Sequence, residues 1–344
     1  MGARKIRQHF ALNICRAYRT TATSSALILA GLLPLHIKAQ AEAAYTRLIH
    51  LRRDATLNGR TLCPITFEHP GDVLQTHPAL KGKGVRVTIS TEPSANMAND
   101  NKAYIFTDGS KFENGVGCAF VQFENHITTY EWKGHLADSN SVFQAEALAL
   151  TAAVQHIIED TGINNATIFS DSASTLYAIQ NHMHTSQIIM NLQQMLRLNS
   201  SREISIKWVK AHAGILGNEA ADQLAKEAAN NIAAQELYVP SPPSYLKRLL
   251  KDEAARIWQS EWDQSDTGRR TYMFFPKVST DRTIGIAPLS HYISGHGPFP
   301  TYFCRHGIST TNVCVCGNEG TPDHYIYLPM PTYVAAPPAY TIQQ

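Results

Sequence analysis

The chain has 344 residues, of which 44% are hydrophobic and 17% are charged, and its formal net charge is +2. This is an ordinary globular balance with room for two or three domains, so neither composition nor charge suggests a disordered polyelectrolyte. Six cysteines spread thinly along the chain exclude a disulfide-dense scaffold and favour reduced thiols in the nucleus or cytoplasm.

The first sixty residues are basic and helical in pattern. Apolar residues four apart, Phe10, Ile14 and Tyr18, predict helix between about 4 and 53, with a break from Thr20 to Ser25. Lys and Arg outnumber Asp and Glu ten to two in this stretch. The excess favours a polyanionic neighbour, or simply a solvated helix surface.

No membrane-spanning helix is expected. The longest apolar run, residues 26–37, is interrupted by Gly31 and Pro34. It is also shorter than the roughly 20 apolar residues that crossing a bilayer requires. A secretory leader is not expected either, because the apolar stretch comes late and its flanks fit poorly.

Residues 90–102 are rich in Asn and predict a linker, and residues 103–232 after it are the best-patterned part of the chain. The expected strands are 103–107, 115–123, 127–132, 166–169 and 204–209, and the expected helices are 142–159, 172–181, 187–198 and 218–230. The order βββαβααβα predicts an α/β domain with a mixed sheet.

Four acidic residues occupy related places in this pattern. Asp108 and Asp171 each end a strand, Glu146 lies on the first turn of a helix, and Asp222 lies one turn into the last helix. Taken singly, each has an ordinary explanation as a turn residue, a solvated helical side chain or a helix cap. Taken together, they predict carboxylates gathered at one sheet edge, where mutual repulsion calls for divalent cations.

Several short motifs carry a resemblance to a known family. They are Thr107-Asp108-Gly109-Ser110, Gln144-Ala145-Glu146, Ser170-Asp171-Ser172, Val209-Lys210-Ala211-His212-Ala213-Gly214 and Gly217-Asn218-Glu219-Ala220-Ala221-Asp222. In order and spacing the set closely resembles ribonuclease H, in the variety carried by insect non-LTR retrotransposon polyproteins. The resemblance implies a ribonuclease H-like α/β fold, with a five-stranded mixed sheet and flanking helices. It also implies an endonuclease that hydrolyses the RNA strand of RNA–DNA hybrids and leaves 5′-phosphomonoesters.

The resemblance also assigns roles to individual residues. Asp108, Glu146, Asp171 and Asp222 would hold two Mg²⁺ ions, for which Mn²⁺ could substitute, and His212 would assist proton movement or product release. Candidates for contacts to the RNA, whose 2′-hydroxyl must be recognised, are Gly109, Ser110, Lys111 and Gln144. Val142 and Phe143 stand where some relatives carry amides, which leaves that part of recognition open.

The flanks complete the expected domain plan. Residues 1–89 resemble the segment that follows the reverse transcriptase in such polyproteins, yet no Tyr-x-Asp-Asp motif occurs, so polymerase activity is not expected. After residue 232 we expect a proline-containing linker at 233–245, a helical and irregular region at 246–328, and a disordered tail at 329–344. Within the second of these, 246–262 is predicted to be helical and 267–300 irregular.

A Cys/His motif lies near the C-terminal end. Cys314, Cys316 and His324 are similar to part of a Cys-Cys-His-Cys zinc site found in related polyproteins. Zinc prefers four ligands, and the last cysteine has no counterpart near Leu328 or Pro329. Cys304 or His306 could replace it, but a decayed or truncated element is the simpler interpretation.

We therefore expect a stand-alone or truncated ribonuclease H module of retroelement origin, intracellular and by default monomeric. Its partner would be an RNA–DNA hybrid, with no small-molecule cofactor and no membrane. One alternative is a catalytically inactive remnant that binds nucleic acid or protein. Another is an integrase or transposase, but those use three acids with a Glu on a late helix, whereas Glu146 lies on the first helix of the domain.

Overall fold

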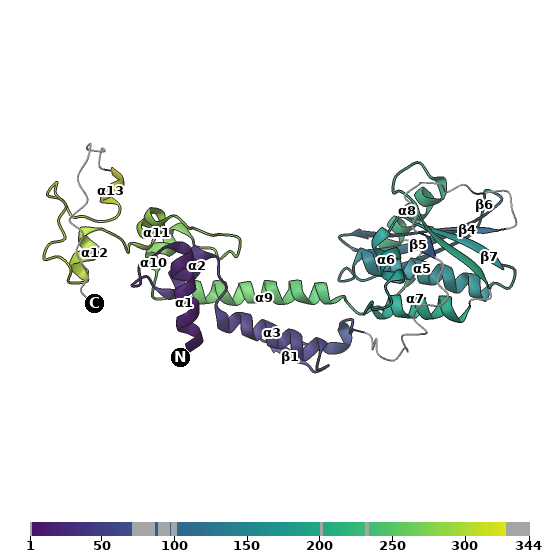
Figure 1. Ribbon diagram of the computed structural model, residues 1–344, viewed down its shortest axis with the longest axis horizontal. Helices are drawn as coiled ribbons and strands as arrows, with labels where there is room; N and C mark the ends of the chain where they lie inside the picture. The colour runs from purple at the N-terminus through teal and green to yellow at the C-terminus, as the bar shows by residue number, and fades with distance from the viewer. Residues whose placement is uncertain are drawn as a thin grey trace. The chain divides into compact units, whose positions relative to one another are not determined.

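The structure is a computed structural model that describes residues 2–70, 87–88, 97, 102–199, 202–230 and 234–327. Contacts between residues divide the chain into two compact units (Figure 1). The helical unit combines residues 1–42 with 251–344, and the sheet unit is residues 43–250. The predicted tail, 329–344, and nearly all of the predicted linker, 90–102, lie outside the described residues. The predicted domain boundaries stay predictions.

The sheet unit is built on a mixed sheet. Its five longer strands are β4 (Ala103–Phe112), β5 (Gly115–Glu124), β6 (Ile127–Leu136), β7 (Asn165–Ser170) and β8 (Glu203–Trp208). Two-residue strands, β3 (Val87–Thr88) and β9 (Gln235–Glu236), extend its two edges and give the order β3-β8-β7-β4-β5-β6-β9. β4, β5 and β6 run antiparallel, whereas β4, β7 and β8 run parallel. The predicted mixed sheet is confirmed, with the two short edge strands added.

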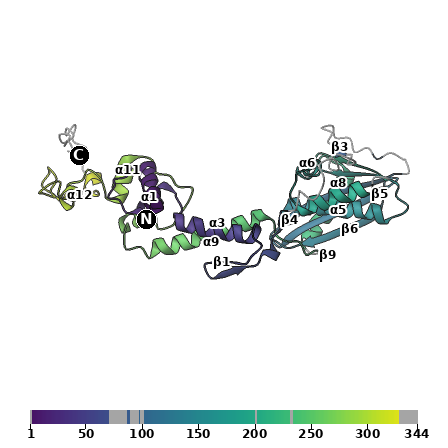
Figure 2. The same cartoon turned by 60° about the horizontal axis from the view of Figure 1, so that its bottom comes forward.

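Helices cover both faces of this sheet, which Figure 2 shows from a second side. They are α5 (Val142–Glu159), α6 (Ala173–Gln180), α7 (Gln187–Leu198) and α8 (Leu216–Ala229). Because side chains alternate along a strand, Ile105 packs with Leu150 of α5, while Phe106 next to it packs with Ala221 of α8. Both faces of the central strands are therefore buried.

Close approach of α8 to the sheet depends on a glycine in β5. A Cβ at Gly117 would lie 2.0 Å from the carbonyl oxygen of Ala225 and 2.3 Å from the backbone nitrogen of Ala229. Only glycine leaves room for the helix backbone at that distance. This contact fixes α8, and with it Asp222, against the sheet.

A short segment before the sheet also belongs to this unit. The strands β1 (Ala55–Leu57) and β2 (Arg60–Leu62) form a hairpin, and a 3₁₀ turn, η1 (Pro64–Thr66), follows it. The hairpin turns at Asn58 and Gly59, whose φ angles are 51° and 76°. Positive φ at both central residues suits a tight hairpin and is readily adopted by Asn and Gly. This hairpin was not among the predicted elements.

The helical unit contains α1 (Gly2–Cys15), α2 (Thr23–Ala30), α10 (Arg269–Phe274), α11 (Ala287–Ser294), α12 (Pro300–Arg305) and α13 (His324–Tyr327). It also takes the first part of α3 (Leu35–Ile49) and most of α9 (Pro243–Asp263). Residues from both ends of the chain share its core, since Leu29 packs with Ile293, and Ile28 with Trp258.

The prediction that 267–300 is irregular was wrong, because α10 and α11 lie inside it. Six- and eight-residue helices hold too few turns to display an apolar period. Among the described residues, no helix combines the length and the apolar character that crossing a membrane requires.

Candidate active site

Three of the four predicted carboxylates meet at one edge of the sheet. Strands β4 and β7 are parallel neighbours in which Thr107 pairs with Ser170, so the next residues, Asp108 and Asp171, lie side by side. Glu146, the fifth residue of α5 and so just past its first turn, reaches the same place. One oxygen of each of the three carboxylates lies within 4.8 Å of the other two.

Gly109 allows helix α5 to lie close to this strand. A Cβ at position 109 would lie 2.8 Å from the backbone nitrogen of Glu146 and 3.1 Å from its Cγ. The backbone N–H of Gly109 also donates to Oδ1 of Asp108 at 2.7 Å, which orients that carboxylate. Gly109 therefore shapes the site through its backbone and its lack of a side chain.

The electrostatics of the three acids favour a cation. Burial, followed by the negative charge of Asp171, raises the pKa of Asp108 to about 7. Burial, followed by the charge of Asp108, raises the pKa of Glu146 well above its usual range. Oε2 of Glu146 is buried and has no hydrogen-bond partner in the described part of the chain. A hard divalent cation would satisfy this oxygen and offset the repulsion, so the residues fit such an ion.

Two residues that the sequence analysis did not propose hold Asp171 in place. Nδ2 of Asn218 donates to Oδ2 of Asp171 at 3.0 Å, and the indole N–H of Trp208 donates to the backbone carbonyl of Asp171 at 3.0 Å. Asn218 is part of the motif that ends at Asp222, but the sequence pattern indicated only that a helix begins there. Nothing in the sequence pattern pointed to Trp208.

Asp222 lies close to the group without being part of it. Its Oδ2 accepts a hydrogen bond from Nζ of Lys226, one turn along α8, at 2.6 Å. Its charge nevertheless contributes to the raised pKa of Asp108. A role for Asp222 as a fourth ligand stays a prediction.

His212 stands in an exposed loop before α8. Its φ is +51°, and that of nearby Gly214 is +75°, so the loop turns through left-handed backbone on both sides of Ala213. Within the described residues, His212 is not among the ligand atoms that gather with the carboxylates. Its predicted role is untested.

The predicted RNA contacts are partly engaged by the protein itself. Nζ of Lys111 donates to the carbonyls of Asp138 and Asn140, at 2.6 Å each. Gln144 is buried and forms a capping box with Ser141 at the start of α5. Ser110 is half-buried on β4. Substrate contacts by Gly109, Ser110, Lys111 and Gln144 stay predictions.

A second cluster of ligand atoms lies in the helical unit. Atoms of Cys314, Cys316 and His324 gather within 4.8 Å, and Sγ of Cys316 is 3.1 Å from Nε2 of His324. The pKa of Cys314 is lowered to about 6, first by the backbone N–H of Cys316 and then by the hydroxyl of Tyr325. Neither Cys304 nor His306 belongs to this group. Three sulfur and nitrogen donors in one place match a zinc site that lacks one ligand.

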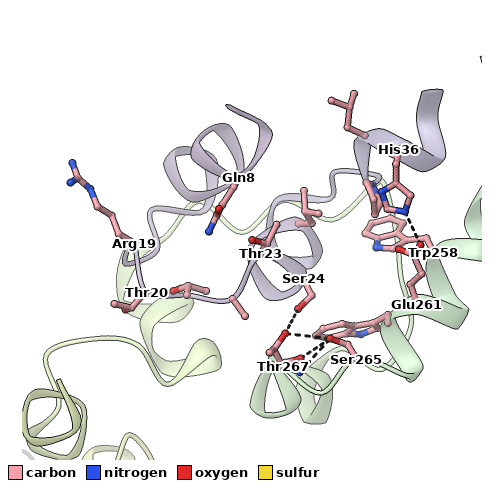
Figure 3. A pocket seen from close by; sticks show the side chains of 16 residues that line it. Gln8, Arg19, Thr20, Thr23, Ser24, His36, Trp258, Glu261, Ser265 and Thr267 are labelled. Carbon is pink, nitrogen blue, oxygen red and sulfur yellow. Dashed lines mark hydrogen bonds and ion pairs between the residues drawn. The ribbon is translucent and has the colours of Figure 1, made fainter. Parts of the chain in front are cut away.

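The helical unit also holds a cavity of about 560 Å³, drawn in Figure 3. Hydroxyls of Thr20, Thr23 and Ser24 line one side, and the other side carries Trp258 and a hydrogen bond of 2.7 Å between Nε2 of His36 and Oε1 of Glu261. No predicted catalytic residue lines this cavity.

Known proteins resemble the sheet unit. The family model described as RNase H matches residues 100–230. A ribonuclease H of Enterobacter sp. (strain 638) is 31% identical over 144 residues, which are 37% of this chain and 88% of that protein. A ribonuclease H of Tropheryma whipplei (strain Twist) is 43% identical over 51 residues, or 15% of this chain.

One relative is a retrovirus-related Pol polyprotein from a type-1 retrotransposable element R1 of Bradysia coprophila, 35% identical over 79 residues and 22% of this chain. The chain spans only 8% of that polyprotein and 32% of the Tropheryma enzyme. Among solved structures, RNase H1 of Halobacterium salinarum NRC-1 aligns with 38% of this chain and 98% of its own, at 21% identity and a TM-score of 0.32.

Proposed function

The chain belongs to the ribonuclease H family, and on that premise we propose that it is an endonuclease that hydrolyses the RNA strand of RNA–DNA hybrids. The observation that carries the proposal is the convergence of Asp108, Glu146 and Asp171 on one small volume, with a buried Glu146 oxygen that has no partner among the described residues. Such a volume suits hard divalent cations better than it suits three unneutralised carboxylates.

Each carboxylate has a distinct task in this proposal. Asp108, Glu146 and Asp171 would hold two Mg²⁺ ions, with Asp222 as a fourth ligand after it releases Lys226. When bound, a pair of such cations stabilises the attacking water and the leaving oxygen of a phosphodiester. His212 would accept or pass on a proton near the leaving group.

The surrounding residues would position these ligands. Asn218 restrains Oδ2 of Asp171, and the indole of Trp208 fixes the backbone of the same residue. The Gly109 N–H keeps Asp108 turned toward the shared volume. Preset ligand orientations of this kind limit the reorganisation that catalysis requires.

The direct test uses the full chain and an end-labelled hybrid, with Mg²⁺ or with EDTA. We expect Mg²⁺-dependent cleavage of the RNA strand to 5′-phosphate products. Asp171→Asn should lower the rate by at least about 100-fold, since losing an outer-sphere partner of a metal site alone costs about 10- to 100-fold. Asp138→Asn is a matched control, because Asp138 is an exposed carboxylate outside the cluster.

Two results would contradict the proposal. The first is cleavage by Asp171→Asn at the wild-type rate, and the second is cleavage that EDTA leaves unchanged. Binding of the hybrid without any cleavage would instead favour the inactive nucleic-acid-binding alternative.

A further inference from the structure

An acidic side chain from outside the predicted nuclease segment is bound by residues of that segment. Glu68 follows η1, and three groups of the nuclease segment hold its carboxylate. Oε1 accepts from the hydroxyl of Ser186 at 2.5 Å and from the backbone N–H of Gln187 at 3.2 Å. Oε2 accepts from Nε2 of Gln144 at 3.1 Å. The contact joins residues more than seventy positions apart in the sequence.

The donors form a place suited to an anion. Gln187 is the first residue of α7, a twelve-residue helix whose first-turn N–H groups have no acceptor within the helix. These groups and the helix dipole favour negative charge. Ser186 occupies the N-cap, but its side chain does not cap its own helix and donates to Glu68 instead. The Glu68 carboxylate is thus a bound anion supplied by the chain.

This place includes one of the predicted substrate contacts, Gln144. Gln144 lies two residues before Glu146, in the first turn of α5. Of the two donors on its side-chain amide, one goes to the backbone carbonyl of Pro240 at 2.9 Å and the other to Glu68. The carbonyl oxygen of the same amide accepts from the N–H of Ser141. Exchanging the bond to Glu68 breaks no contact between this amide and the backbone.

The backbone of the Glu68 segment is fixed independently of the carboxylate. The Glu68 N–H donates to the carbonyl of Ser241 at 2.8 Å, and the Ser241 N–H donates to the carbonyl of Thr66 at 2.9 Å. Phe67 is buried, and the two ring nitrogens of His69 contact the carbonyls of Ile49 and Pro64. Replacing the carboxylate alone should therefore leave the segment in position.

We propose that the Glu68 carboxylate occupies the place of a nucleic-acid phosphate and competes with the hybrid for Gln144, Ser186 and the N–H of Gln187. The inference rests on the proposed function, because it takes the hybrid as the ligand. In the free protein Glu68 closes this donor cluster. When the hybrid binds, one of its phosphodiesters displaces the carboxylate and frees an N–H of Gln144 for the substrate.

The test measures affinity separately from cleavage. A fluorescent hybrid is titrated with the full chain in Ca²⁺, with the hybrid checked for intactness, and cleavage is measured in Mg²⁺. Glu68→Gln keeps an acceptor oxygen for Ser186 and Gln187 but removes the charge. The dissociation constant should fall about fivefold, because apparent affinity scales with the fraction of protein whose site is open. Glu131→Gln removes the same charge from an exposed position on β6 and should leave the dissociation constant unchanged.

A second variant tests whether the phosphate takes the same donors. Adding Ser186→Ala to Glu68→Gln should remove most of the gain in affinity, whereas Ser186→Ala alone should have a smaller effect, since Glu68 still fills the site. This non-additivity marks a shared place rather than a general charge effect. Thermal unfolding of each variant reports on its fold, and Ser186→Ala alone provides the comparison if Glu68→Gln is unstable.

The possible outcomes are distinct. Equal affinities of Glu68→Gln and wild type would overturn the inference, as would a gain in affinity that survives the addition of Ser186→Ala. Tighter binding by Glu68→Gln, with no cleavage by any variant, would support the inference and reject the nuclease function.

Discussion

At the scale of single residues, the carboxylates make stability depend on pH and on metal. The pKa of Asp108 is about 7 in the folded protein, against 3.8 ordinarily, and that of Glu146 is also raised. Between about pH 4 and 7 the folded protein therefore holds more protons than the unfolded chain. Stability rises with pH only where the unfolded state holds more protons, so here it falls as the pH increases.

We accordingly expect the melting temperature of the sheet unit in EDTA to fall from pH 5 to pH 8. Mg²⁺ should raise it more at pH 8 than at pH 5, since ligands must lose their protons to bind a metal. Calorimetric scans at four pH values measure both effects. Asp108→Asn removes one of the shifted groups and should flatten the pH dependence. Equal stabilisation by Mg²⁺ at pH 5 and at pH 8 would contradict this account.

Gly109 permits a second prediction at this scale. Gly109→Ala would place a methyl group 2.8 Å from the backbone nitrogen of Glu146, closer than such atoms approach in proteins. Either β4 or the first turn of α5 must then shift, at a cost of about 1–3 kcal/mol. Because the crowded nitrogen belongs to Glu146 itself, cleavage should decrease together with the melting temperature.

The matched control is Gly162→Ala, where the nearest atom to a new Cβ is the end of the flexible Asp160 side chain, at 3.1 Å. It should leave the cleavage rate unchanged. If Gly109→Ala cleaves as fast as wild type, the close packing of β4 on α5 is not what positions Glu146.

At the scale of whole elements, the sequence was informative where a pattern had room to repeat. The bounds of α5 and α7 agree with the predicted 142–159 and 187–198, because each holds at least three turns of apolar spacing. The helices α10 and α11 were missed because each is too short to show an apolar period. The hairpin β1–β2 was missed although its Asn58-Gly59 turn is a local signal for a two-residue hairpin loop.

In the candidate site, too, some contacts could be predicted from local sequence and others could not. Asp108 and Asp171 could be predicted to meet, because each directly follows the last paired residues of two parallel strands, Thr107 and Ser170. The prediction that Asp108 ends its strand was wrong, since β4 continues to Phe112 in its pairing with β5.

The pairing of Asp222 with Lys226 lies within α8, and their spacing of four residues is a local signal that the prediction did not use. The support that Asn218 and Trp208 give to Asp171 depends instead on how α8 and β8 pack. Tertiary contacts of that kind leave no local signature in the sequence.

The cysteine motif of the helical unit gives a prediction about an element. Cys314, Cys316 and His324 gather although the fourth ligand of the resembled motif is missing. A thiol with a pKa of about 6 is mostly thiolate at pH 7, which is the form that binds metal. We expect about one zinc ion per chain, with water or a further group completing the tetrahedron.

Elemental analysis of protein purified without chelators tests the zinc prediction. Cys316→Ser with His324→Ala should lose the metal, whereas Cys63→Ser, at an exposed cysteine outside the cluster, should retain it. Retention of zinc by the double variant would place the metal elsewhere. Absence of zinc from the wild type would support the interpretation of a decayed element.

At the scale of the whole molecule, the core of the helical unit is built from two segments of the chain, one before the sheet unit and one after it. Leu29 and Ile28, before the sheet unit, pack against Ile293 and Trp258, after it. Trp258 and Trp262 are only 3% and 2% exposed. Burial of one large apolar side chain is worth about 1.5–3 kcal/mol, and a whole domain is stable by only about 5–15 kcal/mol. Neither half of this core should therefore fold without the other.

Removal of residues 1–42 should consequently unfold the region from 251 to 327 while the sheet unit stays folded. Hydrogen exchange followed by mass spectrometry measures this directly, because amides of α9 and α11 should lose protection and those of β4 and α5 should keep it. In the intact chain, Ile28→Ala should lower the free energy of opening that protects the same amides by about 2–5 kcal/mol. Leu35→Ala, at a side chain that is 37% exposed, should have little effect on their protection. Full protection of α9 and α11 in the truncated chain would mean that the C-terminal half folds alone. The packing of Leu29 and Ile28 on the C-terminal part of the helical unit would then be incidental to its stability.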